Sequence, residues 1–209
     1  MKLLVVGGSR GVGREVVRLA LARGHRVSVL ARHPERIGMQ HPRLQLFSGD
    51  VLDERKVARV VAGHDAVVSA TGTAPSWRET RLFSAGTANL LAAMRAAGVS
   101  RLVAVTGIGA GDSRGHGGWF YDRLLQPLLL GRIYADKNRQ EAMIARSHAE
   151  WTIVRPGFLV SGPAERRYRV LRDLDGVRAG SISRADVAQF IVAALEQEAW
   201  IGWTVLLSN

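Results

Sequence analysis

Three glycines near the N-terminus have the types and spacing needed to bind phosphate. Gly7, Gly11 and Gly13 follow an apolar run over 3–6 and precede a segment with helical spacing. Glycine permits a sharp turn, and its bare backbone lets phosphate oxygens approach closely. The N-terminus of the following helix supplies free N–H groups and the positive end of a dipole. This order predicts a pyrophosphate site made by Gly7, Ser9, Arg10, Gly11, Val12 and Gly13.

The end of the second predicted strand indicates which dinucleotide would bind. A site that prefers NAD usually has Asp or Glu about 20 residues after the glycines, to bind the ribose 2′-hydroxyl. Here the strand over 26–31 is followed by Arg32, with no acid. A guanidinium can hold a 2′-phosphate bidentately, and Arg10 could approach the same phosphate from the other side. The alternative is that both are ordinary surface arginines. We expect NADP(H) as the cofactor.

The elements that must position these residues alternate along the chain. Apolar runs predict strands over 3–6, 26–31, 44–47, 66–70, 102–105, 151–154 and 203–207. Helical segments are predicted over 15–22, 53–62, 76–98, 133–147 and 183–195; the third would open with a capping box, Ser76-Trp77-Arg78-Glu79. The alternation predicts an α/β fold of the Rossmann type. We expect a doubly wound, mostly parallel sheet of order 3-2-1-4-5-6 in a three-layer αβα sandwich, forming one domain over 1–209 with substrate-side portions at 107–131 and 157–182.

Ligands of such sheets bind beyond the carboxyl ends of the strands. That rule selects the residues that follow the predicted strands. Asp50 would accept a hydrogen bond from the adenine amine, or it is a simple turn aspartate. The remaining candidates for cofactor binding are small or polar: Val51, Ala70, Thr71, Gly72, Thr106, Gly107, Pro156 and Gly157.

Five motifs together resemble one superfamily. They are VGGSRGVG at 6–13, LAR at 30–32, GDVLD at 49–53, WTIVRPG at 151–157 and ISRADVA at 182–188. The chain resembles the atypical short-chain dehydrogenase/reductase superfamily, and within it the NAD(P)H-binding group that includes NmrA-like proteins and the biliverdin reductase B/flavin reductase type. The resemblance covers nearly the whole chain and is specific for fold and cofactor. It is much less specific for the substrate.

The resemblance also identifies candidate catalytic residues, with one departure. Most catalytic members carry a Tyr-x-x-x-Lys pair and an upstream Ser or Thr, whereas this chain has YADK at 134–137, one residue short of that spacing. An offset of three still leaves both side chains on one helix face. The resemblance therefore implies that Lys137 holds the nicotinamide ribose, that Tyr134 reaches the substrate, and that Thr106 is the third partner. Structural roles for Tyr134, Lys137 and Thr106 are the alternatives.

The reductase type named above lacks that acid–base pair, and solvent supplies the proton. Positioning can then be the main contribution of the protein to hydride transfer. The stretch over 107–131 should lie over the nicotinamide end. Its glycines suit a lid, and Trp119, Phe120 and Tyr121 could line an aromatic pocket. Alternatively, the leucines over 124–130 form a helix that packs on the domain or on a second subunit.

Composition limits the classes of function. The formal net charge is +11, but the basic residues are scattered without a run longer than Arg166-Arg167, so we expect no nucleic-acid partner. The charge would instead steer an anionic cofactor. There is no cysteine, hence no disulfide or thiolate site, and we expect no metal. No apolar run approaches the roughly 20 residues that span a bilayer. We expect a cytoplasmic protein without membrane association.

These observations predict an NADPH-dependent oxidoreductase that transfers a hydride to a small planar or carbonyl-bearing acceptor. A flavin, a quinone, a biliverdin-like pigment or a ketone would fit. One alternative is a non-catalytic NADP(H) sensor of the NmrA-like type, which would bind a partner through 107–131. Another is an epimerase or isomerase that recycles bound cofactor, although little chain follows Pro156 to form a sugar-nucleotide domain. We expect a monomer or a homodimer.

Overall fold

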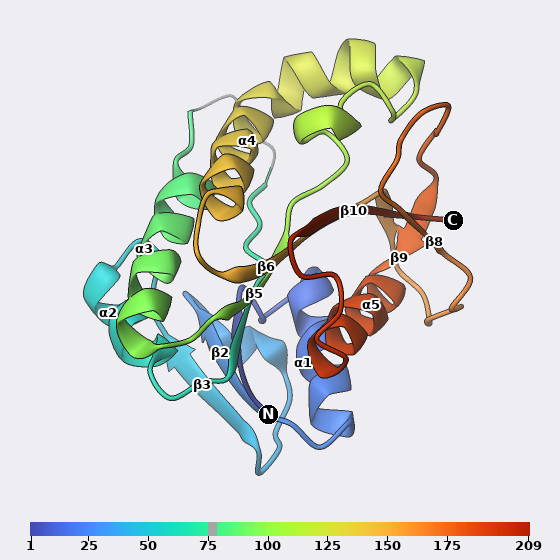
Figure 1. The fold of residues 1–209 in the computed structure, drawn as a ribbon. Coiled ribbons are helices and arrows are strands. Elements are labelled where there is room, and N and C mark those ends of the chain that lie inside the picture. Colours follow the sequence, from blue (N-terminus) through green and yellow to red (C-terminus); the bar gives the residue numbers. More distant parts are fainter. Residues whose placement is uncertain (75–78) are drawn as a thin grey trace.

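A computed structural model describes residues 1–74 and 79–209. Its centre is an eight-stranded sheet of order β3-β2-β1-β4-β5-β6-β10-β8, which contains the predicted 3-2-1-4-5-6 order (Figure 1). All neighbouring strands are parallel except β10 and β8, which are antiparallel. The strands are β1 (Lys2–Val6), β2 (Arg26–Ala31), β3 (Leu44–Ser48), β4 (Ala66–Ser69), β5 (Arg101–Val105), β6 (Glu150–Pro156), β8 (Arg169–Leu171) and β10 (Trp203–Ser208).

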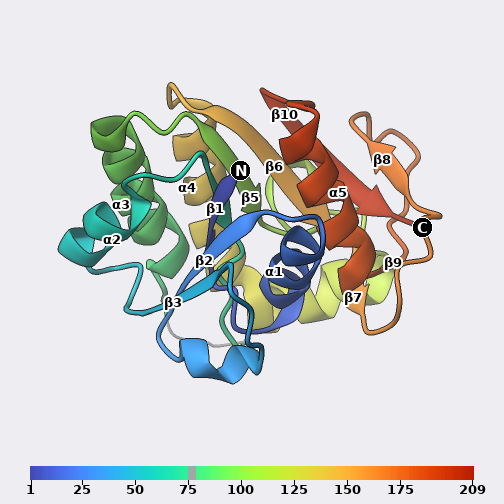
Figure 2. The same cartoon turned by 90° about the horizontal axis from the view of Figure 1, so that it is seen from below.

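Helices cover both faces of the sheet. In Figure 2, α1 and α5 lie side by side on one face, while α2, α3 and α4 cover the other. This arrangement confirms the predicted three-layer Rossmann architecture. The helices are α1 (Gly11–Ala22), α2 (Glu54–Val61), α3 (Leu82–Ala97), α4 (Gly131–Ala145) and α5 (Arg184–Glu196).

A hydrophobic layer lies on each face of the sheet, because successive side chains of a strand point to opposite faces. In β1, Leu3 and Val5 pack against residues of α1 and α5, whereas Leu4 and Val6 point to the opposite face and pack against α2 and α3. All four side chains are buried. A strand buried on both faces needs a continuous apolar run, and this explains the run over 3–6.

Helix ends are formed partly by local caps and partly by distant residues. Asp53 and Ser183 accept backbone hydrogen bonds at the starts of α2 and α5, as expected. The expected capping box at 76–79 lies largely outside the described residues, and α3 begins later, at Leu82. There the buried carboxylate of Asp136, on α4, accepts a hydrogen bond from Phe83 N at 2.8 Å. A tertiary contact therefore caps α3.

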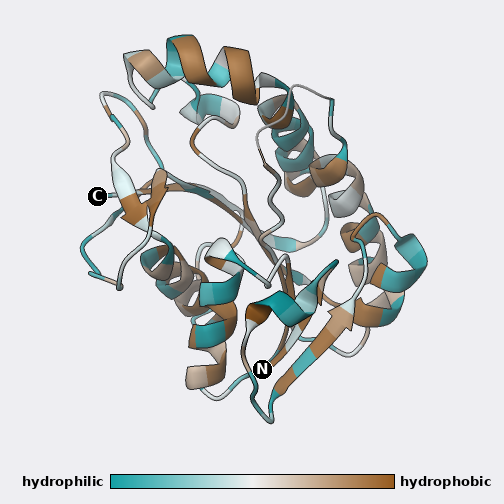
Figure 3. Cartoon of the chain, turned by 180° about the vertical axis from the view of Figure 1, so that it is seen from behind, coloured by the Kyte–Doolittle hydropathy of each residue, from teal (hydrophilic) through white to brown (hydrophobic). Residues whose placement is uncertain are grey.

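The stretch over 113–131 is more regular than the sequence pattern predicted. A π-helix, η3 (Tyr121–Leu130), runs directly into α4. It packs on the domain because Tyr121 and Leu125 contact a cluster that includes Phe158 and Leu206. Hydrophobic residues are visible on this helix at the top of Figure 3, and Leu128 is 62% exposed.

Smaller elements complete the carboxyl edge of the sheet. Two short parallel strands, β7 (Phe158–Val160) and β9 (Ser181–Ser183), form a second sheet that the sequence did not predict. Two 3₁₀ turns, η1 (Pro34–Ile37) and η2 (Gly111–Ser113), follow β2 and β5. Within the described part of the chain, no helix has the length and apolarity to cross a membrane.

Candidate functional site

A cleft of about 610 Å³ runs along the carboxyl edge of the parallel strands. Residues at or after the ends of the six strands of the predicted 3-2-1-4-5-6 order contribute to it, so segments far apart in the sequence meet where the topology requires. Most of the predicted site residues line it: Gly7, Ser9, Arg10, Gly11, Val12, Arg32, Asp50, Val51, Ala70, Thr71, Gly72, Thr106, Lys137 and Pro156.

Four predicted site residues do not line the cleft: Tyr134 and the glycines Gly13, Gly107 and Gly157. A Cβ on Gly13 would lie 2.4 Å from the carbonyl oxygen of Gly7, so this glycine permits α1 to approach β1. A Cβ on Gly157 would lie 2.4 Å from the carbonyl oxygen of Gly180. Gly107 has a φ of +153° and lies against the hydroxyl of Tyr134. These glycines shape the walls of the cleft from behind.

The glycine-rich turn (residues 7–13) has the form of a phosphate cradle. Gly7 adopts a φ of +81°, and a Cβ there would lie 2.6 Å from the carbonyl oxygen of Ala70. The N-cap residue of α1, Arg10, makes no side-chain capping bond, and the first turn contains no acid. The first N–H groups of α1 thus have no side-chain cap, which suits an anionic ligand. The residues present fit a dinucleotide pyrophosphate.

The end of the cleft beside β2 is basic. Arg10 and Arg32 lie there, as predicted, together with His33 and Arg36. His33 and Arg36 were not among the predicted site residues, although both lie in the turn directly after Arg32. Asp50 also lines this end, but its carboxylate accepts a hydrogen bond from Leu52 N at 3.0 Å, so it is at least a turn aspartate.

At the opposite end, Lys137 of α4 donates a hydrogen bond to the carbonyl oxygen of Thr106. Its ammonium lies 5.0 Å from the ring centroid of Phe83, within the range of a cation–π contact. Burial lowers the pKa of Lys137 to about 8, and the negative charge of Glu141 opposes that shift only in part. The cleft therefore holds an amine poised near neutral pH at its inner end.

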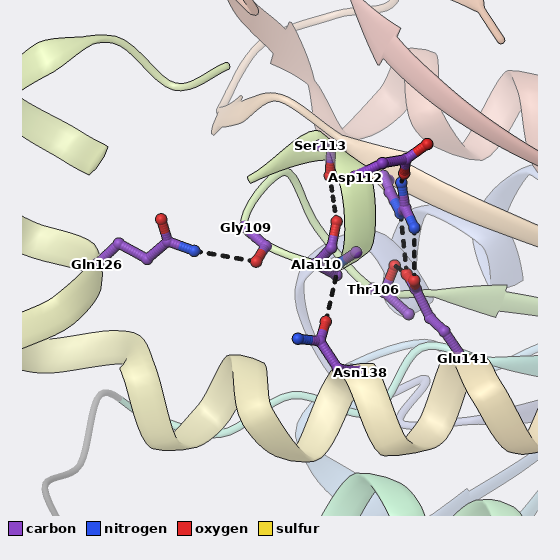
Figure 4. Close-up of polar contacts among 10 residues, drawn as sticks. Thr106, Gly109, Ala110, Asp112, Ser113, Gln126, Asn138 and Glu141 are labelled. Atoms are coloured by element: carbon purple, nitrogen blue, oxygen red, sulfur yellow. Dashed lines mark hydrogen bonds and ion pairs between the residues drawn. The ribbon is translucent and has the colours of Figure 1, made fainter. Parts of the chain in front are cut away.

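Thr106 is tied to a buried ion pair (Figure 4). Its hydroxyl donates to Glu141 Oε1 at 2.6 Å, and Arg155 donates to both carboxylate oxygens of Glu141. Arg155 also pairs with Asp112, which is largely exposed. Burial alone would lower the pKa of Arg155, but hydrogen bonds and charge from Glu141 and Asp112 raise it above its usual value. Glu141 is therefore held by Arg155 in the position where it accepts a hydrogen bond from Thr106.

The loop after β5 is held from several sides, as Figure 4 shows. Gly111 N donates to Asn138 Oδ1 at 2.8 Å, and Gln126 Nε2 donates to the carbonyl oxygen of Gly109 at 3.0 Å. A Cβ on Gly111 would lie 2.1 Å from an Arg155 nitrogen. The sequence suggested a flexible loop here, whereas the side chains of α4, η3 and β6 hold it in one place.

Tyr134 is not part of the cleft lining, although its ring centroid lies 5.8 Å from the ammonium of Lys137. Its hydroxyl accepts a hydrogen bond from the hydroxyl of Tyr121 at 3.0 Å, and its ring lies against Gly109. Burial, together with the neighbouring Tyr134, raises the pKa of Tyr121. The structure thus brings Thr106 and Lys137 to the cleft and places Tyr134 behind the loop. The catalytic assignment of the three residues stays a prediction.

Fold and site together define a nicotinamide-dinucleotide-binding protein of the Rossmann class. The chain belongs to the NAD(P)H-binding family, whose model matches residues 7–198. The predicted membership of the atypical short-chain dehydrogenase/reductases, with their NmrA-like members, is confirmed.

Relatives are spread over plants and bacteria. An uncharacterized chloroplastic protein of Arabidopsis thaliana is 32% identical over 94% of this chain and 72% of its own length. A protein named an uncharacterized sugar epimerase, YhfK of Bacillus subtilis, is 26% identical over 95% of this chain and 89% of its own length. Among solved structures, the anaerobilin reductase ChuY of Escherichia coli O157:H7 superimposes with a TM-score of 0.85 at 24% identity, covering 100% of this chain and 97% of that one. At 24% identity, the likeness to ChuY shows that the two proteins share a fold.

Proposed function

We propose that the protein is an NADPH-dependent reductase of a small planar or carbonyl-bearing acceptor. When bound, the reduced nicotinamide supplies a hydride to the acceptor. The glycine-rich turn would hold the pyrophosphate, Lys137 the nicotinamide ribose, and Thr106 the carboxamide or acceptor side of the ring. The residues of this chain would thus bind and orient the two reactants.

The preference for NADPH rests on charge at the adenosine end. Arg10, Arg32 and Arg36 line the cleft there, and Glu35, the acid in the turn after β2, is not part of the cleft lining. Guanidinium groups form charge-assisted hydrogen bonds with a phosphate, whereas a carboxylate at this position would repel it. The arrangement supports recognition of the 2′-phosphate.

The observation that best supports a planar acceptor is the position of Tyr134. Within the described part of the chain, the cleft lining contains no tyrosine, and its one acid, Asp50, lies at the adenosine end. The Thr106 hydroxyl donates a hydrogen bond to Glu141, which is paired with Arg155. An acceptor that takes its proton from solvent, such as a flavin, a quinone or a biliverdin-like pigment, suits this cleft better than an alcohol that needs a base.

The same observation argues against the epimerase reading. An epimerase that oxidises a sugar hydroxyl needs a general base close to that hydroxyl. Tyr134 would have to leave its hydrogen bond with Tyr121 and cross the loop to provide one. The name of the Bacillus subtilis relative keeps this activity as a comparison in the assay, with a UDP-sugar as the substrate.

The experiment measures NADPH oxidation at the nicotinamide absorbance band with flavin, quinone, biliverdin and ketone acceptors. We expect turnover with at least one planar acceptor, and we expect Tyr134→Phe to retain it within about threefold. A loss of 100-fold or more in Tyr134→Phe, as removal of a general acid causes, would contradict proton delivery by solvent.

The second candidate function is a non-catalytic NADP(H) sensor, which an exposed apolar surface at η3 favours. Trp119 is 69% exposed and Leu128 is 62% exposed, both on or beside η3. Exposed apolar residues grouped on one segment are typical of interaction sites. Tight NADPH binding with no turnover of any acceptor would favour the sensor over the reductase.

A further inference from the structure

Arg184 lines the cleft but has no part in the assignments above. It is the first residue of α5, and Pro156 and Leu159 lie beside it in the wall of the cleft. Its Nη1 donates to Ser161 Oγ at 3.3 Å. None of the ion pairs found among residues 1–74 and 79–209 includes Arg184. A guanidinium without a carboxylate partner therefore borders the cleft.

The backbone that carries Arg184 is held rigidly. A Cβ on Gly157 would lie 2.4 Å from the carbonyl oxygen of Gly180, so the chain segments that lead into β7 and β9 are in close contact. The last residue of β9, Ser183, caps α5 by accepting a hydrogen bond from Asp186 N at 2.9 Å. The Asp186 carboxylate also accepts from Arg166 N at 2.8 Å, so the neighbouring loop is tied to the same helix start. Arg184 is thus presented on a fixed element.

The start of α5 lies next to the start of α1. The two helices pack side by side on one face of the sheet (Figure 2), and residues from both N-termini line the same cleft. Helices in contact lie about 8–10 Å apart, a distance that an arginine side chain can largely bridge. The uncapped N-terminus of α1 is the predicted position of the pyrophosphate. Arg184 and the N-terminus of α1 therefore border the same cleft.

The 2′-phosphate has other partners. It would bind beyond β2, which is farther from β6 in the sheet order than β1 is. Arg10, Arg32 and Arg36 already surround that end. The pyrophosphate, in contrast, carries negative charge that the peptide N–H groups of α1 only partly neutralise.

We propose that Arg184 is a cofactor-binding residue that holds the pyrophosphate against the N-terminus of α1. The cofactor is then clamped by the glycine-rich turn on one side and by the first residue of α5 on the other. This inference rests on the dinucleotide site of the proposed function. Arg184 could instead bind a carboxylate on the acceptor, and the experiment distinguishes between these two anions.

The experiment compares the binding of three ligands to the wild-type protein and to Arg184→Gln by titration calorimetry. The ligands are NADPH, ADP-ribose, which keeps the pyrophosphate, and adenosine 2′-monophosphate, which lacks it. We expect the dissociation constants of NADPH and ADP-ribose to rise about tenfold or more, because a charge-assisted hydrogen bond is lost. That of adenosine 2′-monophosphate should stay within twofold.

Two variants serve as controls. Arg184→Lys keeps the charge, so its affinity for NADPH and ADP-ribose should fall less than that of Arg184→Gln. Arg26→Gln removes an exposed arginine at the start of β2, and its dissociation constants for all three ligands should equal those of the wild-type protein. Thermal unfolding checks that each variant is folded. If Arg184→Gln is unfolded, the comparison of Arg184→Lys with the wild-type protein decides, with ADP-ribose affinity expected to fall severalfold.

Three results would overturn the assignment. The first is ADP-ribose affinity unchanged within twofold in a folded Arg184→Gln. The second is an equal loss for adenosine 2′-monophosphate. The third is unchanged NADPH binding with a raised KM for carboxylate-bearing acceptors only, which would assign Arg184 to the acceptor. Failure of the proposed function is distinct. If the reductase activity alone is absent, the wild-type protein binds NADPH without turnover and Arg184 is still tested by binding; if the dinucleotide site is absent, the wild-type protein binds neither NADPH nor ADP-ribose.

Discussion

Glu141 and Arg155 form a buried two-point ion pair behind the carboxyl end of β5. Arg155 Nε lies 3.0 Å from Glu141 Oε1, and Nη2 lies 2.6 Å from Oε2. The two side chains are 7% and 8% exposed. Because Glu141 Oε1 also accepts the proton of Thr106, this pair fixes the residue that the cofactor and acceptor would meet.

Removal of the Glu141 charge should destabilise the fold strongly. Glu141→Gln leaves Arg155 buried with only Asp112 as a counter-charge, so we expect the free energy of unfolding to fall by about 3–5 kcal/mol. Urea denaturation measures it. Asp112→Asn removes the exposed partner, whose side chain is 78% exposed, and should cost less than about 1 kcal/mol. Equal losses in the two variants would contradict the importance of the buried pair.

Lys137 should make stability depend on pH in the cofactor-free protein. Burial lowers its pKa to about 8 in the folded state, against an ordinary value of 10.5 for a lysine side chain in water. Between these values the unfolded chain binds more protons, so the contribution of Lys137 to the free energy of unfolding rises with pH. Below about pH 8 the full cost of burying the charged amine remains, roughly 3 kcal/mol at most.

The variant Lys137→Met isolates this effect. We expect it to be more stable than the wild-type protein at pH 7, with a difference that shrinks toward pH 10.5. Urea denaturation at several pH values provides the measurement. A constant difference across this range would show that Lys137 titrates normally in the folded protein. The same variant should bind NADPH more weakly, because it lacks the ammonium assigned to the nicotinamide ribose.

Arg32 should discriminate between the two nicotinamide cofactors. In Arg32→Ala we expect NADPH affinity to fall about 10–100-fold, since a charged hydrogen bond contributes about 1.5–3 kcal/mol, while NADH affinity stays within twofold. Fluorescence titration of both cofactors measures this. Arg59→Gln, an exposed arginine on α2, is the matched control. Unchanged NADPH affinity in Arg32→Ala would refute the 2′-phosphate assignment.

Gly13 should tolerate no side chain. The alanine methyl would lie 2.4 Å from the carbonyl oxygen of Gly7, so α1 must move away from β1 at a cost of about 1–3 kcal/mol. We expect Gly13→Ala to lose thermal stability and cofactor binding together. Gly72→Ala is the matched control, because nothing lies within 4 Å of its Cβ position, and its stability should change by less than about 0.5 kcal/mol.

Much of the fold was predictable because its signals are local. The apolar run before Gly7, the period of the strands, and the caps at Asp53 and Ser183 each depend on residues a few positions apart. Parallel strands joined by helices then leave few possible sheet orders, and the carboxyl edge follows. The sequence alone therefore determined the Rossmann class, the strand order and most of the residues that line the cleft.

The tertiary structure decided what surrounds the reactive groups, because those contacts join residues distant in the sequence. The pairing of Glu141 with Arg155, and of Asp136 with the start of α3, follows from helix packing that no periodicity encodes. The hydrogen bond between Tyr121 and Tyr134 also depends on how η3 packs against α4. The lowered pKa of Lys137 likewise needs a three-dimensional burial that composition does not reveal.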